Sequence, residues 1–291
     1  QAADFAGAAL AEGIAPDAVI GHSAGEVAAA YAAGIYTLDE AARVAVVRGR
    51  LQATLAGRGA MLAVGLSEDE AAEAIADLPG VSLAAINDHQ AVTVAGDASQ
   101  IAELEQRMRD QRVFAKLLRV EVPYHSPVMD EIAGELADQM SFIEPKPARL
   151  PIYSTVSGTL STGEEWGAGY WPRNVRLPVR FARAVGQALA DGSTTFLELA
   201  PHPVLTPSIE ALARTTTGVS VTPLLSRRDD EYRLFLGAVG KLALEGVGRP
   251  PRTRSAPLPA PVRALQKVWD QDPWYDVDRA NSSAVPGLTL L

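Results

Sequence analysis

The chain has 291 residues, 47% hydrophobic and 21% charged, which is enough to bury a sizeable core in one large domain or in a large and a small one. A net charge of −9 gives no basic footprint for nucleic acid, and no apolar run reaches the roughly 20 residues that cross a bilayer. Cysteine is absent, which excludes disulfides and thiolate chemistry and fits the cytoplasmic location that we expect.

A strand and a helix come first. Residues 17–21, with the apolar run Ala-Val-Ile at their centre, predict a strand, and the alanine-rich run 23–34 predicts a helix that Gly34 ends in the left-handed conformation. Ser23 therefore lies at the turn between the two elements.

The next helix carries an arginine on its apolar side. It is predicted over 38–56, and its first turn forms a capping box. At about 100° per residue, Arg48 falls inside the apolar stripe, whereas Arg43 and Arg50 fall on the opposite face. A buried guanidinium needs a carboxylate or carbonyl partners. Arg48 is therefore either one partner of a structural ion pair or a bidentate binding group for a substrate carboxylate.

Between residues 59 and 120, the pattern of apolar residues changes and predicts short strands as well as helices. Strands are predicted at 60–66, 81–87, 91–96 and 113–120, and helices at 67–78 and 97–111. The order β-α-β-β-α-β predicts a ferredoxin-like subdomain, inserted into the larger domain.

Strands alternate with helices again after the insertion. The flanking segments 1–58 and 121–245 therefore predict one α/β core with a hydrolase-like parallel sheet. Proline becomes frequent after residue 246, and we expect 246–291 to be a semi-rigid linker that follows the domain.

The turn at Ser23 has the form Gly-x-Ser-x-Gly, from Gly21 to Gly25. Between a strand and a helix, such a turn exposes the serine oxygen and points backbone N–H groups at a developing oxyanion. The same pattern also occurs as a purely structural turn, but the strand-turn-helix context favours a nucleophile.

Four histidines could serve as the base for this serine. The side chain of His22 diverges from its neighbour on the elbow and is expected to be structural or to line the pocket. His89 lies in a predicted hairpin turn, and His202 lies between two prolines, where it supports the site or turns the chain. His125 follows the last strand of the insertion and is the best candidate by position.

These residues together resemble the acyltransferase domain of type I polyketide synthases over about residues 5–245. The G-H-S-x-G elbow makes Ser23 the acylated serine. Arg48, 25 residues later, matches the arginine that grips the free carboxylate of the extender unit. The motif Val-Pro-Tyr-His before Ser-Pro-x-Met makes His125 the general base. Two further runs match the family, at 170–181 and 202–205.

The resemblance implies a dyad of Ser23 and His125, because no Asp or Glu convincingly completes a triad. The main-chain carbonyl of Asn174 would orient the histidine, and the backbone N–H of Ala24 would donate to the oxyanion. The side chains that would bind the substrate are those of Arg48, His22, Tyr124, Val122 and His202. The Gly-Gln-Gly-x-Gln segment that opens such domains is not in the sequence, so we expect the chain to be N-terminally incomplete.

The resemblance also implies the substrates and partners. Malonyl-CoA would donate the acyl group, and the phosphopantetheine thiol of an acyl carrier protein would receive it, with no metal and no bound cofactor. Neighbouring synthase domains such as a ketosynthase would be further partners. An acidic carrier protein would need a local basic patch, for which the nearest cluster in the sequence is Arg173, Arg176, Arg180 and Arg183.

The specificity motif departs from both common forms, H-A-F-H for malonyl and Y-A-S-H for methylmalonyl. Here it reads V-P-Y-H, and the Tyr124 ring would fill the space that an α-methyl group needs, which favours malonyl. A hydrophobic pocket discriminates one methyl group by only ~1–3 kcal/mol, so leakage is expected. Methylmalonyl or other acyl selectivity, a serine esterase or thioesterase, and a non-catalytic scaffold fragment of a synthase remain as alternatives.

Overall fold

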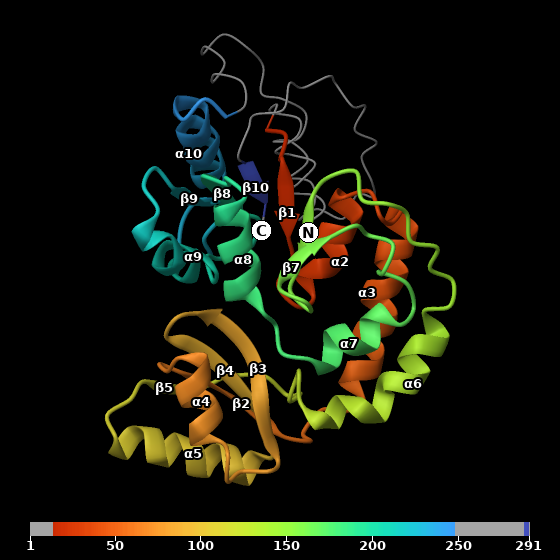
Figure 1. Ribbon diagram of the computed structural model, residues 1–291, viewed down its shortest axis with the longest axis vertical. Coiled ribbons are helices and arrows are strands. Elements are labelled where there is room, and N and C mark those ends of the chain that lie inside the picture. Colours follow the sequence, from red (N-terminus) through yellow and green to blue (C-terminus); the bar gives the residue numbers. More distant parts are fainter. Residues whose placement is uncertain (1–13, 248–287, 291) are drawn as a thin grey trace.

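The computed structural model describes residues 14–247 and 288–290. Two sheets form the framework (Figure 1): a larger one with most of the helices around it, and a smaller one that lies below it in this view. Each sheet has its own hydrophobic core. Fully buried aromatic side chains such as Trp166 and Trp171 fill the larger core, and aliphatic ones such as Leu62 and Ile101 fill the smaller.

The larger sheet has six strands in the order β7-β6-β1-β10-β8-β9. In chain order they are β1 (Ala18–Ile20), β6 (Ile152–Ser154), β7 (Thr159–Ser161), β8 (Thr195–Glu198), β9 (Ser220–Pro223) and β10 (Leu288–Leu290). Neighbouring strands are parallel except for the antiparallel pair β6 and β7. The sheet is therefore mixed, whereas the sequence predicts a parallel one, because a short turn joins β6 to the antiparallel strand β7.

Strand β10 corrects the linker prediction in part. Leu288–Leu290 pairs with β1 on one side and β8 on the other, in the middle of the sheet, and Leu290 is buried. These three residues therefore belong to the sheet, because their main chain pairs with a neighbouring strand on each side. The rest of the predicted linker, 248–287, lies outside the described residues.

The helices of the larger part begin and end near their sequence signals. They are α2 (Gly25–Ala32), α3 (Leu38–Ala53), η1 (Pro127–Met129), α6 (Asp130–Gln139), α7 (Tyr170–Arg176), α8 (Phe181–Ala190), α9 (Thr206–Leu212), η2 (Ala213–Thr215) and α10 (Glu231–Leu244). The predicted capping box between Thr37 and Glu40 opens α3, and Gly34 has a φ of +76° just after α2.

The smaller sheet is antiparallel, with strand order β3-β4-β2-β5. Its elements are β2 (Ala60–Val64), α4 (Glu68–Ala74), β3 (Val81–Asp88), β4 (Ala91–Gly96), α5 (Ala98–Asp110) and β5 (Ala115–Leu117). Their order agrees with the predicted one. One face packs on α4 and α5, and the other turns Met61, Ala84 and Ala95 toward Tyr124.

The two parts meet along β3. The main chain of Val179, just before α8, exchanges hydrogen bonds with Ala84 and Ile86 at 2.9 Å. Within 14–247 and 288–290, no helix is both long enough and apolar enough to span a bilayer.

Candidate active site

Ser23 lies on a tight turn between β1 and α2. Its φ of 53° is left-handed, a conformation that costs energy for a residue with a Cβ and is common at functional turns. A Cβ at Gly21 would lie 2.4 Å from the backbone N and Cα of Glu26, so only glycine allows this approach. The chain can make this turn because Gly21, which has no Cβ, lies where the end of β1 approaches the start of α2.

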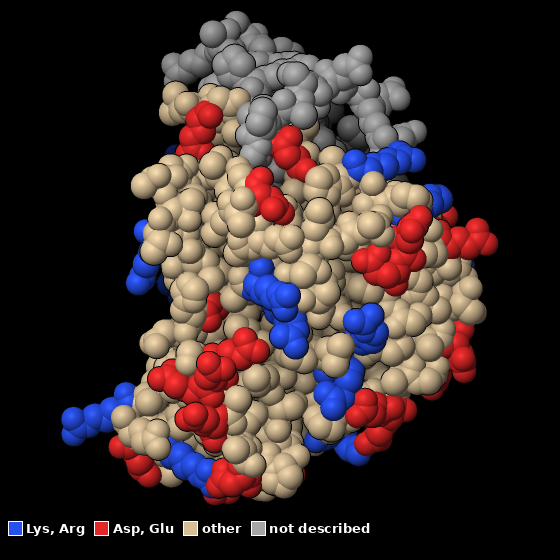
Figure 2. All heavy atoms as spheres, in the orientation of Figure 1, with Lys and Arg blue, Asp and Glu red and all other residues tan. Residues whose placement is uncertain are grey.

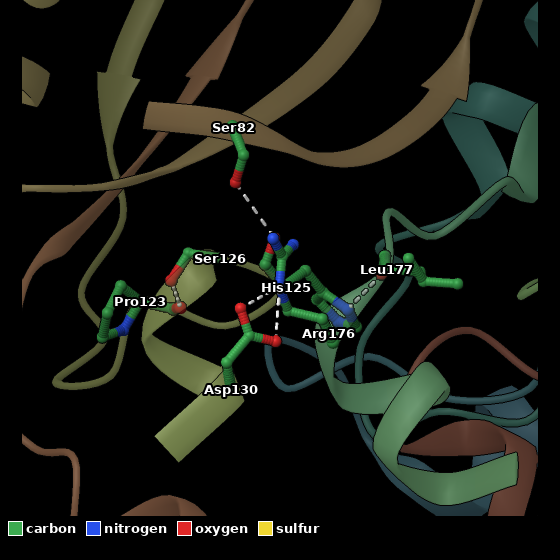
Figure 3. A network of polar contacts seen from close by, with 7 residues as sticks. All are labelled: Ser82, Pro123, His125, Ser126, Asp130, Arg176 and Leu177. Atoms are coloured by element: carbon green, nitrogen blue, oxygen red, sulfur yellow. Dashed lines mark hydrogen bonds and ion pairs between the residues drawn. The ribbon is translucent and has the colours of Figure 1, made fainter. Parts of the chain in front are cut away.

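His125 is the second strained residue, with a φ of 60°. It lies between β5 and η1, and its main chain is held at both ends: its N–H donates to Val175 O at 3.2 Å, and its carbonyl accepts from Ser82 Oγ at 3.2 Å. Figure 3 shows His125 between Ser82 of the smaller sheet and Leu177 of the segment after α7. The ring is thus fixed where the two parts of the molecule meet.

The two side chains form a nucleophile–base pair. Ser23 Oγ lies 2.7 Å from His125 Nε2, and the opposite ring nitrogen, Nδ1, lies 2.9 Å from Leu177 O. A carbonyl only accepts, so Nδ1 carries the proton and Nε2 is free to accept the serine proton. Burial, and next the charge of Arg48, lower the pKa of His125 to about 3, so the ring is neutral at neutral pH.

The orienting carbonyl differs from the predicted one. His125 Nδ1 donates its hydrogen bond to Leu177 O, three residues beyond Asn174, although the Asn174 carbonyl also helps to raise the pKa of His125. The chain turns out of α7 at Leu177, and this frees its carbonyl to face the ring. The side chain of Asn174 is used elsewhere in the site.

Arg48 points inward from α3, as predicted, and is 7% exposed. Its Nε donates to Asn174 Oδ1 and its Nη2 to Ser23 Oγ, both at 3.1 Å. Burial lowers its pKa to about 10, which the charge of Glu26 partly offsets. In the part of the chain that the structure describes, no carboxylate forms an ion pair with it, so the structural ion pair is the weaker of the two interpretations.

Sequence reasoning missed Glu26, in the first turn of α2. Its carboxylate is fully buried and accepts hydrogen bonds from Thr155 N, Thr155 Oγ1, Tyr170 Oη and Asn174 Nδ2 at 2.6 to 2.9 Å. Burial raises its pKa, and these donors act in the opposite direction. An acidic residue in a first turn usually faces solvent, and only the buried alanines three and four positions later, Ala29 and Ala30, give a signal for the inward face.

Three of the predicted substrate-binding residues, His22, Tyr124 and Val122, differ in their burial and contacts. His22 contacts Asn87 of β3 at 2.8 Å through Nε2, and its ring packs edge-on against Phe181. Burial lowers the pKa of His22. Tyr124 is half-buried and packs against the cores of both parts of the molecule. Val122 is buried in the larger core.

The remaining candidates are Ala24, His202 and His89, and only Ala24 adjoins the dyad in the sequence. Ala24 is exposed at the start of α2, and the hydrogen bonds that close the elbow come from Gly25, Glu26 and Val27, so none of them uses the Ala24 N–H. His202 is half-buried in the loop after β8, and its Nδ1 has no hydrogen-bond partner among the described residues. No contact joins His202 to the dyad in that part of the chain. His89 is exposed in the β3–β4 turn, as predicted.

Basic side chains gather in the middle of one face, over α7 and the start of α8 (Figure 2). Arg176 pairs with Asp130 at 3.0 Å and Arg180 with Glu68 at 3.9 Å, whereas Arg173 and Arg183 are exposed. Two of the four predicted arginines are thus partly neutralised.

The arrangement of Ser23, His125 and Arg48 can accept a group that is both electrophilic and anionic. One hydroxyl faces a neutral imidazole and a guanidinium, which suits nucleophilic attack on an acyl group that carries a carboxylate. Across 14–247 and 288–290, no three His, Asp or Glu side chains come together as metal ligands would.

Comparisons with known proteins agree with this chemistry. Residues 1–248 match the family described as acyl transferase domain. The chain is 38% identical over 285 residues to the pikromycin polyketide synthase component PikAII of Streptomyces venezuelae, covering 95% of this chain and 7% of that protein. It is 39% identical over 237 residues to the mycoketide-CoA synthase of Mycobacterium tuberculosis, covering 80% and 6%. The chain therefore spans a small part of these relatives.

Solved structures give the same result. The acyltransferase domain from module 8 of the salinomycin polyketide synthase superposes with a TM-score of 0.79 at 35% identity, over 81% of this chain and 56% of that one. A loading acyltransferase from the avermectin modular polyketide synthase superposes with a TM-score of 0.78 at 35% identity, over 83% and 77%. The chain belongs to the acyl transferase domain family and is an acyltransferase of the polyketide synthase kind.

Proposed function

We propose that the chain moves a malonyl extender unit from CoA to the phosphopantetheine thiol of an acyl carrier protein, through an ester on Ser23. One observation carries the proposal. Ser23 Oγ lies 2.7 Å from His125 Nε2 and 3.1 Å from Arg48 Nη2, so the same oxygen faces a base and a cation. Relatives that are parts of multidomain polyketide synthases support the carrier protein and a ketosynthase as partners.

In the first step, His125 Nε2 takes the Ser23 proton while Oγ attacks the thioester carbonyl of malonyl-CoA. The tetrahedral oxyanion accepts a hydrogen bond from the Ala24 N–H at the start of α2. The C–S bond then breaks, and His125 returns the proton to the CoA thiolate. The malonyl group remains as a serine ester.

The second step reverses the first with a different thiol. His125 takes the proton of the phosphopantetheine thiol, the sulfur attacks the ester carbonyl, and the C–O bond to Ser23 breaks. The proton then returns to Ser23 Oγ. Arg48 holds the malonyl carboxylate in both steps, which keeps the carbonyl oriented and leaves water poorly placed.

Arg48 also links substrate binding to the strength of the base. Its positive charge is the second cause, after burial, of the low pKa of His125. A bound carboxylate offsets that charge and raises the His125 pKa toward a value better suited to a general base. An acyl group without a carboxylate gives up this effect as well as the hydrogen bonds.

Malonyl selectivity depends on Tyr124. Its half-buried ring lies where the two cores meet, one residue before the base His125, and this supports the expectation that an α-methyl group meets the ring. We expect Tyr124→Ser to raise methylmalonyl loading relative to malonyl by about 5- to 150-fold, the equivalent of ~1–3 kcal/mol for one methyl group. Intact-protein mass after exposure to an equal mixture of the two donors measures this ratio, and an unchanged ratio would remove Tyr124 from the acyl pocket.

The finer assignments of fold and boundaries are part of the proposal. The strand order β3-β4-β2-β5 supports a ferredoxin-like subdomain over 59–120, and the elbow after β1 supports a hydrolase-like core formed by 1–58 and 121–245. Arg173 and Arg183 are the exposed cations that support docking of an acidic carrier protein. A cytoplasmic location stays a prediction.

Covalent loading tests the proposed function. Intact-protein mass after brief exposure to malonyl-CoA should show one malonyl adduct on the wild type, none on Ser23→Ala and far less on Arg48→Ala. Arg50→Ala is the matched control, because Arg50 is exposed on the same helix and contacts only Gln139 among the described side chains. Absence of an adduct on the wild type, or loading of Ser23→Ala, would contradict the proposal.

The same measurement separates the rivals. An esterase would release malonate to water and keep no adduct, and a scaffold fragment would never load. His125 Nδ1 faces a carbonyl rather than a carboxylate, and Arg48 touches the nucleophile; both features favour transfer over hydrolysis.

A further inference from the structure

Glu26 is a buried ionisable group, next to the nucleophile's turn, that the proposed steps leave unused. Each of its two oxygens receives an N–H donor: Thr155 N at 2.6 Å on Oε1, and Asn174 Nδ2 at 2.7 Å on Oε2. Hydroxyl groups of Thr155 and Tyr170 complete the set at 2.9 and 2.8 Å. The carboxylate thus connects α2 to the end of β6 and to α7.

Asn174 lies between this carboxylate and the guanidinium of Arg48. Its Nδ2 donates to Glu26 Oε2 and, at 3.2 Å, to the carbonyl of Ser23, while its Oδ1 accepts from Arg48 Nε at 3.1 Å. A carboxylate oxygen accepts and cannot donate, so Glu26 determines which end of the amide faces each neighbour. With Nδ2 held by Glu26, only Oδ1 is left to meet the Arg48 N–H.

We propose that Glu26 is a positioning residue for substrate selection: through Asn174 it holds the Arg48 fork at the angle that receives the carboxylate of the acyl donor. The inference rests on the proposed function and deepens it. The position of the Arg48 guanidinium is tightly constrained, because it must donate to Ser23 Oγ and to the substrate carboxylate at the same time.

The Glu26→Gln substitution tests this relay with little change of shape. A glutamine offers one oxygen and one NH2 group, yet both positions face an N–H donor, so one donor–donor clash is unavoidable. The Thr155 N–H belongs to the main chain and cannot turn, whereas the Asn174 amide can. We therefore expect the amide to flip, which points Nδ2 at Arg48 Nε and displaces the fork.

The readout is the ratio of Ser23 loading rates with malonyl-CoA and with acetyl-CoA, which has no free carboxylate. In Glu26→Gln this ratio should fall about tenfold or more, the loss expected when a hydrogen bond to a charged group is misplaced. Added to Arg48→Ala, the same substitution should change the ratio no further, because the fork is already absent. Tyr170→Phe is the matched control: it removes one donor from the same carboxylate and should leave the ratio unchanged.

The outcomes are distinct. Equal loss with both donors, or an added loss in the Arg48→Ala background, would show that Glu26 is only structural and would overturn the inference. If Glu26→Gln does not fold, Asn174→Ala decides, since an unchanged ratio there also overturns it. A wild type that takes neither donor would overturn the proposed function and this inference together, whereas a wild type that prefers malonyl leaves the proposed function intact whatever the variants do.

Discussion

The four-stranded subdomain and the Ser23 site hold their residues in place by different means. In the subdomain, local contacts fix the helix starts and the β3–β4 connection: Ser67 caps α4, Asp97 caps α5, and a tight turn joins β3 to β4. At the site, Ser23 contacts Arg48 25 residues away and Asn174 151 residues away. Ser23 and His125 both have left-handed backbones, and contacts with distant segments support them. The site therefore depends on how distant segments pack, whereas the helix starts of the subdomain depend on short ones.

Removal of the base should have the largest effect. We expect His125→Ala to lower the rate of Ser23 loading by about 10²- to 10⁴-fold, because the serine then loses its proton acceptor. His89→Ala, in the exposed turn of the subdomain, should leave the rate unchanged. Rapid-quench loading followed by intact mass compares the two, and equal rates for His125→Ala and wild type would assign the base elsewhere.

Acid should destabilise the fold through the same histidine. The folded-state pKa of about 3 lies below the ordinary 6.5, so the unfolded chain binds the proton first, and stability falls as the pH drops from 6.5 toward 3. At about pH 4.5 this amounts to roughly 2–3 kcal/mol in the free energy of unfolding. Urea unfolding at neutral pH and at about pH 4.5 measures the loss, which His125→Gln should reduce by that amount. Parallel losses in the two proteins would contradict the shifted pKa.

Two glycines of one motif should differ in their tolerance of alanine. Gly21→Ala brings a Cβ within 2.4 Å of the Glu26 backbone and should cost about 1–3 kcal/mol of stability and slow the loading of Ser23. A Cβ at Gly25 meets nothing within 4 Å, and Gly25→Ala should change stability by less than about 1 kcal/mol. Thermal unfolding of both variants decides. Similar losses would mean that the elbow is not as tight as its geometry indicates.

Loss of a local cap should have the smallest effect and leave the chemistry intact. Ser67→Ala removes the capping box of α4 and should lower the free energy of unfolding by about 1 kcal/mol, with the loading rate unchanged. Ser99→Ala, exposed near the start of α5, should stay within about 0.5 kcal/mol of wild type. A large loss of activity in Ser67→Ala would contradict the division between local and distant contacts.

Local contacts could be predicted from the sequence, and contacts between distant segments could not. Thr37 with Glu40 and Ser67 with Glu70 are spaced three residues apart, so the helix starts that they form could be predicted from short windows. The inward face of Arg48 followed from the helical period alone. These features need no knowledge of the rest of the chain.

Features that join distant segments could not be predicted from the residues. Leu177 offers a carbonyl to His125 because of where α7 ends, and no property of its side chain indicates this. Glu26 looks like an ordinary acidic residue in a first turn until β6 and α7 cover it. The pairing of Leu288 to Leu290 with β1 depends on two sheet neighbours that only the complete topology supplies.

The contacts across the junction bear on the exchange of segments between synthases. His22 reaches Asn87, and Ser82 reaches the carbonyl of His125, so the residues that flank the nucleophile and carry the base each bond to β3. A chimera that replaces 59–120 as an independent module would cut both bonds unless the donor segment supplies an amide at 87 and a hydroxyl at 82. The smaller sheet thus supports the nucleophile's turn and the base from one strand, and grafts should be matched at these two positions before any pocket residue is altered.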